Sequence, residues 1–257
     1  MQASIQLKPN PAVQYLLRVG DTCLILGQRI AEWCGHGPIL EEDIALTNMA
    51  LDLIGQSRAV LSRAGQLGGQ DFDEDQLAFL RDERDYCNPT LVELPRGDFA
   101  HTVLRNAMVA TLLKLLWERL QESSDAEVAA IAGKAIKEAR YHQQHAADWV
   151  VRLGDGTEES RKRMQTALSE LWRYAPELFA ADAVDAHAQT TGLGPGWDAL
   201  EAEWREEMGS ILQAAELQAP AASAFLSTGK QGVHSEHMGY LLAEMQTLQR
   251  SFPGGAW

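Results

Sequence analysis

The chain has 257 residues, of which 46% are hydrophobic and 23% are charged, and its formal net charge at pH 7 is −14. This is enough apolar material for one large core, and the acidic excess disfavours a nucleic-acid-binding protein, which normally carries a basic patch. The apolar runs are too short to cross a bilayer, which takes about 20 residues, and the first ten residues do not resemble a secretion signal. We therefore expect a cytoplasmic protein that does not bind a membrane.

The cysteine pattern favours a reducing compartment. Cys23, Cys34 and Cys87 are odd in number and show no C-x-x-C spacing. Cys23 and Cys34 lie in apolar helical runs, where a free thiol usually behaves as a small buried hydrophobe.

Helical spacing of apolar residues dominates the chain, and alternation typical of strands is nearly absent. A first helix is predicted from Pro11 to the glycine- and proline-rich residues 35–38. A second helix is predicted over 41–67, with an acidic first turn that suits the positive end of the helix dipole. A short third helix should follow Asp73, where Gln76 completes a capping box.

The fourth predicted helix, 99–121, is apolar on nearly all sides and should lie at the centre of the fold. A capping box formed by Ser124 and Glu127 is predicted to open the fifth helix, and Thr157 should cap the sixth. The expected ranges of the remaining helices are 124–154, 157–174, 197–217 and 234–250, with short helical turns between 175 and 196. Four long helices surrounded by shorter ones predict an all-α, ferritin-like helical bundle in a single domain, 1–257.

Bundles of this kind hold two iron ions with a Glu on each of two helices and a Glu-x-x-His motif on each of the other two. Residues three apart share one helix face, so both side chains of the motif can reach one metal. None of the seven histidines has a glutamate three positions before it. The sequence therefore argues against a standard di-iron site, and neither a nucleophile elbow nor a phosphate-binding glycine loop is present.

One weaker constellation lies on the fifth predicted helix, where Glu138, His142 and His145 share a face. A metal there would need a carboxylate from another helix, and Glu32 is the best donor. The alternative, which we favour, is a set of hydrogen-bonded polar groups that line the bundle.

Two other constellations have simpler interpretations than a metal site. Asp98 precedes His101 by three residues and is most simply the cap of the fourth helix. His234 and His237 could grip zinc, but the sequence places no partner beside them, so exposed or interface histidines are favoured.

On the second predicted helix, Asn48, Asp52 and Gln56 form a polar stripe. Spacing alone leaves open whether this stripe is solvated or faces the bundle centre.

Several long segments resemble the C subunits of phenylacetyl-CoA epoxidases. The segments are residues 26–38 (LGQRIAEWCGHGP), 43–48 (DIALTN), 51–58 (LDLIGQSR), 137–142 (KEARYH), 152–160 (RLGDGTEES) and 242–246 (LAEMQ). The resemblance covers nearly the whole chain, and its motifs are long and mixed in residue type.

The resemblance implies a structural, non-catalytic role in a hetero-oligomeric bacterial monooxygenase that epoxidises the aromatic ring of phenylacetyl-CoA with O₂. It implies no cofactor in this chain. The di-iron centre would belong to a catalytic partner subunit of the same fold. NADPH, flavin and iron–sulfur cofactors would belong to a partner reductase. The resemblance also allows a further small subunit in the complex.

The resemblance also assigns former ligand positions, namely Glu32, Leu53, Gln56, Ala139 and His142. Leu53 and Gln56 would replace the Glu and His of one motif, and Ala139 would replace the Glu that belongs with His142. Two alternatives stay open: an active di-iron oxidase with unusual ligands, and a free-standing helical scaffold.

Overall fold

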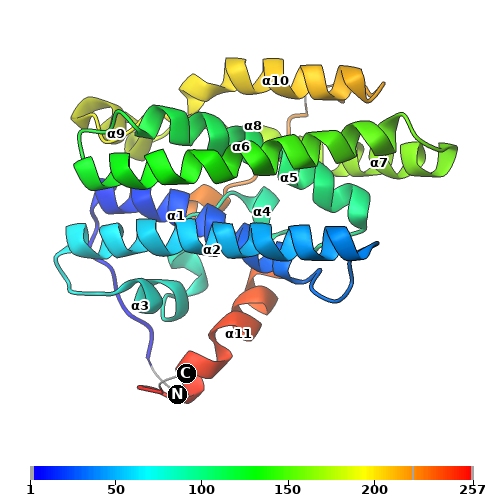
Figure 1. The fold of residues 1–257 in the computed structure, drawn as a ribbon. Coiled ribbons are helices and arrows are strands. Elements are labelled where there is room, and N and C mark those ends of the chain that lie inside the picture. Colours follow the sequence, from blue (N-terminus) through cyan, green and yellow to red (C-terminus); the bar gives the residue numbers. More distant parts are fainter. Residues whose placement is uncertain (1–2, 222, 256–257) are drawn as a thin grey trace.

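The computed structural model describes residues 3–221 and 223–255, and four long helices form its centre (Figure 1). They are α1 (Pro11–Ala31), α2 (Leu40–Gly68), α5 (Phe99–Leu120) and α6 (Ala126–Gly154). α1 packs along α2, α5 packs along α6, and α2 also contacts α6. This arrangement confirms the prediction of an all-α, ferritin-like bundle.

Shorter helices surround the bundle. They are α3 (Glu74–Phe79), α4 (Thr90–Glu93), α7 (Glu158–Leu171), α8 (Ala175–Leu178), α9 (Ala183–Thr191), α10 (Glu201–Ala214) and α11 (Glu236–Ser251). Single 3₁₀ turns are η1 (Glu83–Asp85), η2 (Trp172–Tyr174), η3 (Trp197–Leu200) and η4 (Gly229–Gln231). The predicted helices 157–174 and 197–217 are thus part α-helix and part 3₁₀ turn. No helix in the described ranges is both long and apolar enough to span a membrane.

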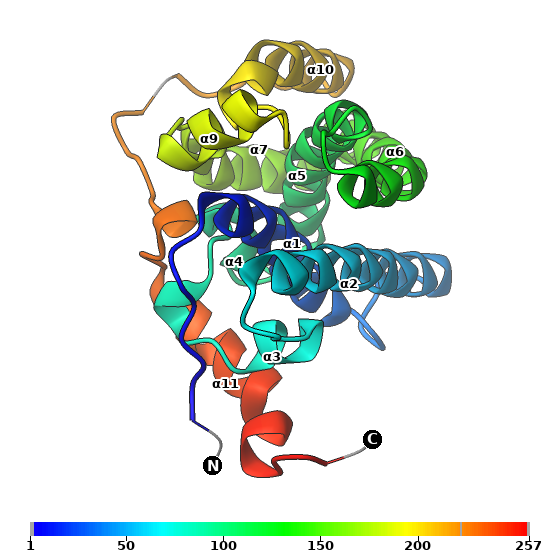
Figure 2. The same cartoon turned by 90° about the vertical axis from the view of Figure 1, so that its left-hand side faces the viewer.

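Figures 1 and 2 show α10 on one side of the bundle and α11 projecting from the opposite side. α5 lies inside, as its composition predicts, because every residue from Thr102 to Leu113 is buried. Its Trp117 side chain is also fully buried. The apolar core therefore surrounds α5.

Side-chain caps begin several helices where the sequence predicts them. Asp73 and Gln76 form the expected capping box of α3, and the Asp98 carboxylate accepts a hydrogen bond from the backbone N–H of His101. Thr157 accepts from the N–H of Ser160 at the start of α7. These bonds satisfy N–H groups that have no partner within a helix.

The capping box predicted at Ser124 is wrong. Asp125 is the residue that caps α6, and its carboxylate accepts from the N–H groups of Glu127 and Val128. The hydroxyl of Ser124 instead donates to the carbonyl of Thr191. Aspartate is at least as good a cap as serine, and the cap therefore lies one residue later than predicted.

The first helix is also shorter than predicted, because α1 ends at Ala31 and a turn follows. The Asp43 carboxylate holds this turn by accepting from the N–H groups of Gly35, at 3.1 Å, and Gly37, at 2.9 Å. Gly35 has a φ of +79°, a left-handed conformation that favours glycine. Cys34 lies in this turn and is exposed, which corrects its expected burial, whereas Cys23 is buried as expected.

Candidate functional site

Three polar pairs join α2 to α6 and form what we call the seam. The Gln56 amide donates to the Glu138 carboxylate over 2.9 Å. Asp52 and His142 are joined over 3.0 Å between Oδ2 and Nε2, and Glu42 and His145 over 2.9 Å between Oε2 and Nε2. Each α6 side chain that the sequence singled out as a weak metal ligand is therefore occupied by a partner on α2.

Gln56 is the most central member of the seam. Its side-chain oxygen accepts from the Trp117 indole N–H over 3.2 Å and from the Cys23 thiol over 3.7 Å, while its N–H₂ group donates to Glu138. Burial, together with the nearby Glu138 charge, raises the pKa of the Cys23 thiol, which therefore keeps its proton and acts as a donor. One neutral amide thus links α1, α2, α5 and α6.

His142 is buried, with 4% of its surface exposed. Burial lowers the pKa of its imidazole below the ordinary value, although the hydrogen bond and charge of Asp52 act in the opposite direction. At neutral pH the ring is therefore uncharged, and its Nε2–H donates to Asp52. The pair is a hydrogen bond between α2 and α6 that needs no metal to satisfy it.

The structure places the expected former ligand positions in two different regions. Leu53 and Ala139 are buried apolar residues on α2 and α6, the helices that also carry Gln56 and His142. Glu32 is exposed just beyond the end of α1, where its carboxylate pairs with Arg29 over 2.6 Å.

The expectation that Glu32 is the best carboxylate donor to the α6 histidines is therefore corrected, because α2 supplies that partner. In the described part of the chain, no three His, Cys, Asp or Glu side chains converge in a way that could hold a metal ion.

The polar stripe on α2 divides between two surroundings. Asp52 and Gln56 face α6, whereas Asn48 is exposed. Sequence reasoning missed Glu42 as a partner of His145, because its place in the first turn of α2 suggested only a favourable interaction with the helix dipole. The sequence did contain an indication of this partner. Glu42, Met49 and Gln56 recur every seven residues, so Glu42 lies on the same helix face as Gln56.

Two further histidines, His101 and His234, are held by carboxylates of this chain. The ring nitrogens of His101 lie 2.8 Å from Asp98 Oδ1 and 3.0 Å from Glu170 Oε2. The His234 side chain is fully buried and lies 2.6 Å from Glu93, which corrects the expectation of an exposed or interface histidine. No sequence pattern indicates this pair, because 141 residues separate its members.

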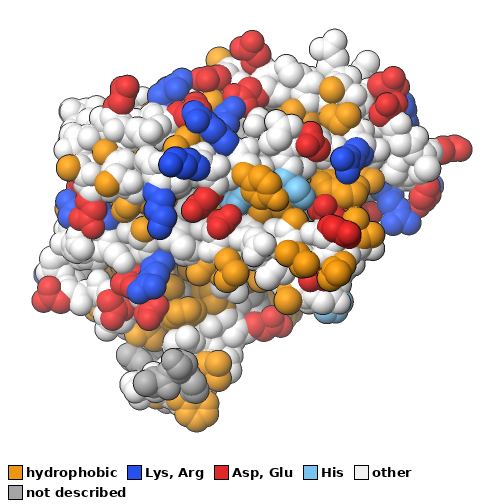
Figure 3. Space-filling model, in the orientation of Figure 1, with side chains coloured by type: hydrophobic (Ala, Val, Ile, Leu, Met, Phe, Trp, Pro, Cys, Tyr) orange, Lys and Arg blue, Asp and Glu red, His pale blue; other side chains and the backbone are white. Residues whose placement is uncertain are grey.

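Exposed apolar side chains lie on the outer side of the seam. We call this group the apolar face, and its members are Ile39, Leu40, Ile44, Leu51 and Tyr141, each more than half exposed. Figure 3 shows hydrophobic side chains gathered there beside the histidines. The Tyr141 ring lies over the seam, with its centroid 6.1 Å from that of His142 and 6.0 Å from that of His145. Large exposed apolar patches mark interaction sites in soluble proteins.

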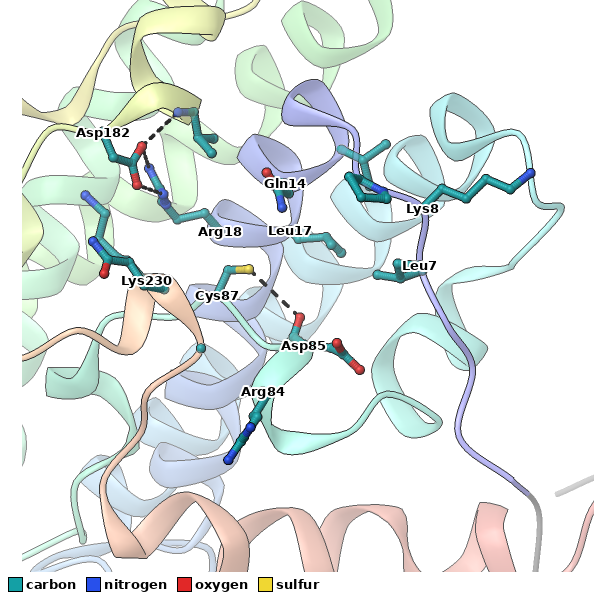
Figure 4. A pocket seen from close by; sticks show the side chains of 15 residues that line it. Leu7, Lys8, Gln14, Leu17, Arg18, Arg84, Asp85, Cys87, Asp182 and Lys230 are labelled. Carbon is teal, nitrogen blue, oxygen red and sulfur yellow. Dashed lines mark hydrogen bonds and ion pairs between the residues drawn. The ribbon is translucent and has the colours of Figure 1, made fainter.

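A cavity of about 330 Å³ lies at the start of α1, beside η1, η4 and the first turn of α9 (Figure 4). Its two buried cations already have partners: Arg18 pairs with Asp182 over 2.6 Å, and Lys230 donates to the carbonyl of Ala180 over 3.0 Å. Burial raises the pKa of the Cys87 thiol to about 12, which makes it unreactive. The cavity therefore has the features of a packing gap between short elements.

Comparisons with known proteins agree with this architecture. A family model described as "Phenylacetic acid catabolic protein" matches residues 1–257. The chain belongs to this family. It is also 48% identical over 248 residues to the C subunit of the 1,2-phenylacetyl-CoA epoxidase of Escherichia coli (strain K12), an alignment that covers 96% of this chain and 100% of that protein. The resemblance to C subunits of phenylacetyl-CoA epoxidases that the sequence predicted is confirmed.

Proposed function

We propose that this chain is the non-catalytic, structural subunit of a phenylacetyl-CoA epoxidase and that it pairs with a separate di-iron subunit that carries out the epoxidation. The Escherichia coli relative, a C subunit by name, matches this chain from end to end, which supports membership of such a multi-subunit enzyme. The iron, and the NADPH-dependent reductase that delivers electrons to it, would then belong to other chains of the complex.

The observation that carries this proposal is the chemistry of the seam. A di-iron centre needs several carboxylates and two histidines directed at one point. Here Leu53, Gln56 and Ala139 occupy positions to which the resemblance assigns ligands, and His142 is bound to Asp52. Hydrogen bonds between α2 and α6 satisfy the polar groups that remain. This arrangement supports a bundle that is stable without metal.

We further propose that the apolar face receives the di-iron subunit. Leu40, Ile44 and Leu51 recur at a helical spacing along α2, and Tyr141 extends the same surface onto α6. A net charge of −14 disfavours close approach of a second copy of this chain. A different subunit of the same enzyme is therefore the partner that fits this surface best.

The test is co-expression of this chain with the di-iron subunit, followed by measurement of complex formation and of iron in each separated subunit. The double substitution Ile44→Asp and Leu51→Asp should weaken assembly at least tenfold, because it places two charges in an apolar contact. Leu248→Asp is the matched control: it changes another exposed leucine, on α11, 51% exposed.

Assembly should persist in the control, and the iron should be found in the partner. Normal assembly by the double variant would refute the docking face while leaving the subunit role intact. Failure of the unaltered chains to assemble would refute the role itself.

A further inference from the structure

Residues 227–235, which we call the strap, lead into α11 and are held by two buried carboxylates. The first is Glu177 of α8, which is 1% exposed. It accepts from the Ser227 hydroxyl over 2.5 Å, from the Lys230 N–H over 2.9 Å and from the Thr90 N–H over 2.9 Å. One carboxylate therefore ties the strap to α4 and α8.

The second carboxylate is Glu93 of α4, which is fully buried. It accepts from the Ser235 N–H over 2.5 Å and from the Asn88 side-chain amide over 3.0 Å, and it lies 2.6 Å from Nδ1 of His234. The other ring nitrogen, Nε2, lies 3.0 Å from the carbonyl oxygen of Tyr86. The His234 ring thus bridges the strap to two points on the segment 86–93.

The protonation of His234 follows from these partners. A carbonyl oxygen can only accept, so Nε2 must carry a proton. Both oxygens of Glu93 already accept hydrogen bonds from N–H groups, so Glu93 meets the ring as an acceptor and Nδ1 must donate as well. We infer that His234 is a buried imidazolium whose pairing with Glu93 latches the strap and α11 onto the bundle, and that loss of its proton opens this latch.

Charged groups of α1 also act on this pair. Arg29 of α1 donates to the carbonyls of Glu93 and His237. Asp21, also on α1, lies within electrostatic range and is itself paired with Arg81. Burial lowers the pKa of His234, but the hydrogen bond and charge of Glu93, with the Tyr86 carbonyl, outweigh burial and leave the pKa above its ordinary value.

The sign of the pH effect follows from this raised pKa. The latch is fully formed below the unfolded-state pKa of about 6.5, and its contribution is lost as pH rises through the folded-state pKa. Lys230 in the same strap acts oppositely, because burial lowers its pKa to about 8, so its charge is disfavoured in the folded state. Variants of His234 are needed to separate the two groups.

The latch holds the residues that lead into α11. The helix projects from the bundle and packs mainly against α3, α4 and η1 (Figure 2). Within the described strap, regular backbone pairing is limited to the 3₁₀ turn η4 and one isolated β-bridge, Thr228 to Val233. Opening of the latch should therefore loosen α11 while the four long helices stay folded, as expected for a region of low local stability.

The test combines two measurements on the full chain. Nitrogen-15 NMR of labelled histidines at pH 6 should show both ring nitrogens of His234 protonated. Amide exchange in α11, corrected for the intrinsic effect of pH, should be about tenfold faster or more at pH 9 than at pH 6, as expected when one charge-assisted hydrogen bond is lost. Exchange in α5 is the internal reference.

Substitution should separate the latch from general packing. His234→Gln should exchange rapidly in α11 at both pH values, and His237→Gln, three residues along the chain, should behave like the unaltered protein. A neutral His234 ring at pH 6, or equal α11 exchange at both pH values in the unaltered chain, would overturn the proposal. Both of these readings come from the unaltered protein, so the test stands even if His234→Gln does not fold.

Discussion

The side-chain amide of Gln56 lies 2.9 Å from the carboxylate of Glu138 and joins α2 to α6 by a hydrogen bond. Its oxygen accepts from Trp117 and Cys23, so both ends of the amide are used. An uncharged group with two donors and one acceptor atom can satisfy these neighbours without a metal. The hydrogen bonds of Gln56 therefore join α2 to α6 without a metal ion.

Gln56→Leu should destabilise the chain by about 2–3 kcal/mol, because the buried Trp117 N–H loses its acceptor and Glu138 loses a donor. Urea unfolding measures the change. Gln144→Leu is the matched control, since the Gln144 side chain is exposed and donates to Asp148 on its own helix. The control should change stability by less than about 0.5 kcal/mol. Equal effects of the two substitutions would show that the central amide is not important for the fold.

Leu53→Glu should destabilise the chain by about 3–5 kcal/mol at pH 7, against less than about 1.5 kcal/mol for the volume-conserving Leu53→Met. Leu53 is 1% exposed, so the new carboxyl would be buried and its pKa raised. The ionisation part of the penalty is absent below the unfolded-state pKa of about 4.3 and grows as pH rises above it. Unfolding of both variants at pH 5 and pH 7.5 tests this. If Leu53→Glu unfolds like the unaltered chain at both values, Leu53 does not face the core.

Loss of the His142 imidazole should lower the free energy of unfolding by more at pH 7.5 than at pH 5. Burial lowers the pKa of His142, so the unfolded chain binds a proton more readily, and the contribution of the neutral ring is lost as pH falls below about 6.5. The stability difference between the unaltered chain and His142→Gln should therefore shrink at pH 5. His187→Gln on α9 is the matched control for loss of an imidazole. A difference that grows at pH 5 would contradict the neutral, buried ring.

The helices could be predicted from sequence because each carries its own local signals. Apolar periodicity located α1, α2, α5 and α6, and caps such as Asp73, Asp98 and Thr157 determined where helices begin. Boundaries failed where two local signals competed, as with Ser124 and Asp125, or where a distant carboxylate such as Asp43 holds a turn.

The candidate site was predictable only in part. The α6 side chains Glu138, His142 and His145 share a helical face, and that face is visible in the sequence. Their partners on α2 lie 82–103 residues away, and spacing cannot say which face of α2 meets α6. The pairing of His234 with Glu93 was missed for the same reason, since 141 residues separate the two side chains and spacing cannot say which elements meet.

Purified by itself, the chain should hold far less than one iron per molecule, and Glu32→Ala should leave that content unchanged, because Glu32 pairs with Arg29 away from the seam. Elemental analysis after anaerobic loading with ferrous iron is the measurement. Stoichiometric iron that is lost on substitution of Glu138 or His142 would support the alternative of an active di-iron oxidase with unusual ligands.

We propose that this chain supports the chemistry of a partner and performs none itself. The most direct measurement is oxygen-dependent turnover of phenylacetyl-CoA with the reductase and NADPH, using this chain alone, the di-iron subunit alone, and the two together. We expect turnover only when both chains are present, and we expect it to survive His142→Gln in this chain whenever the complex assembles. Epoxidation by this chain and the reductase, without the di-iron subunit, would refute the supporting role proposed for this chain.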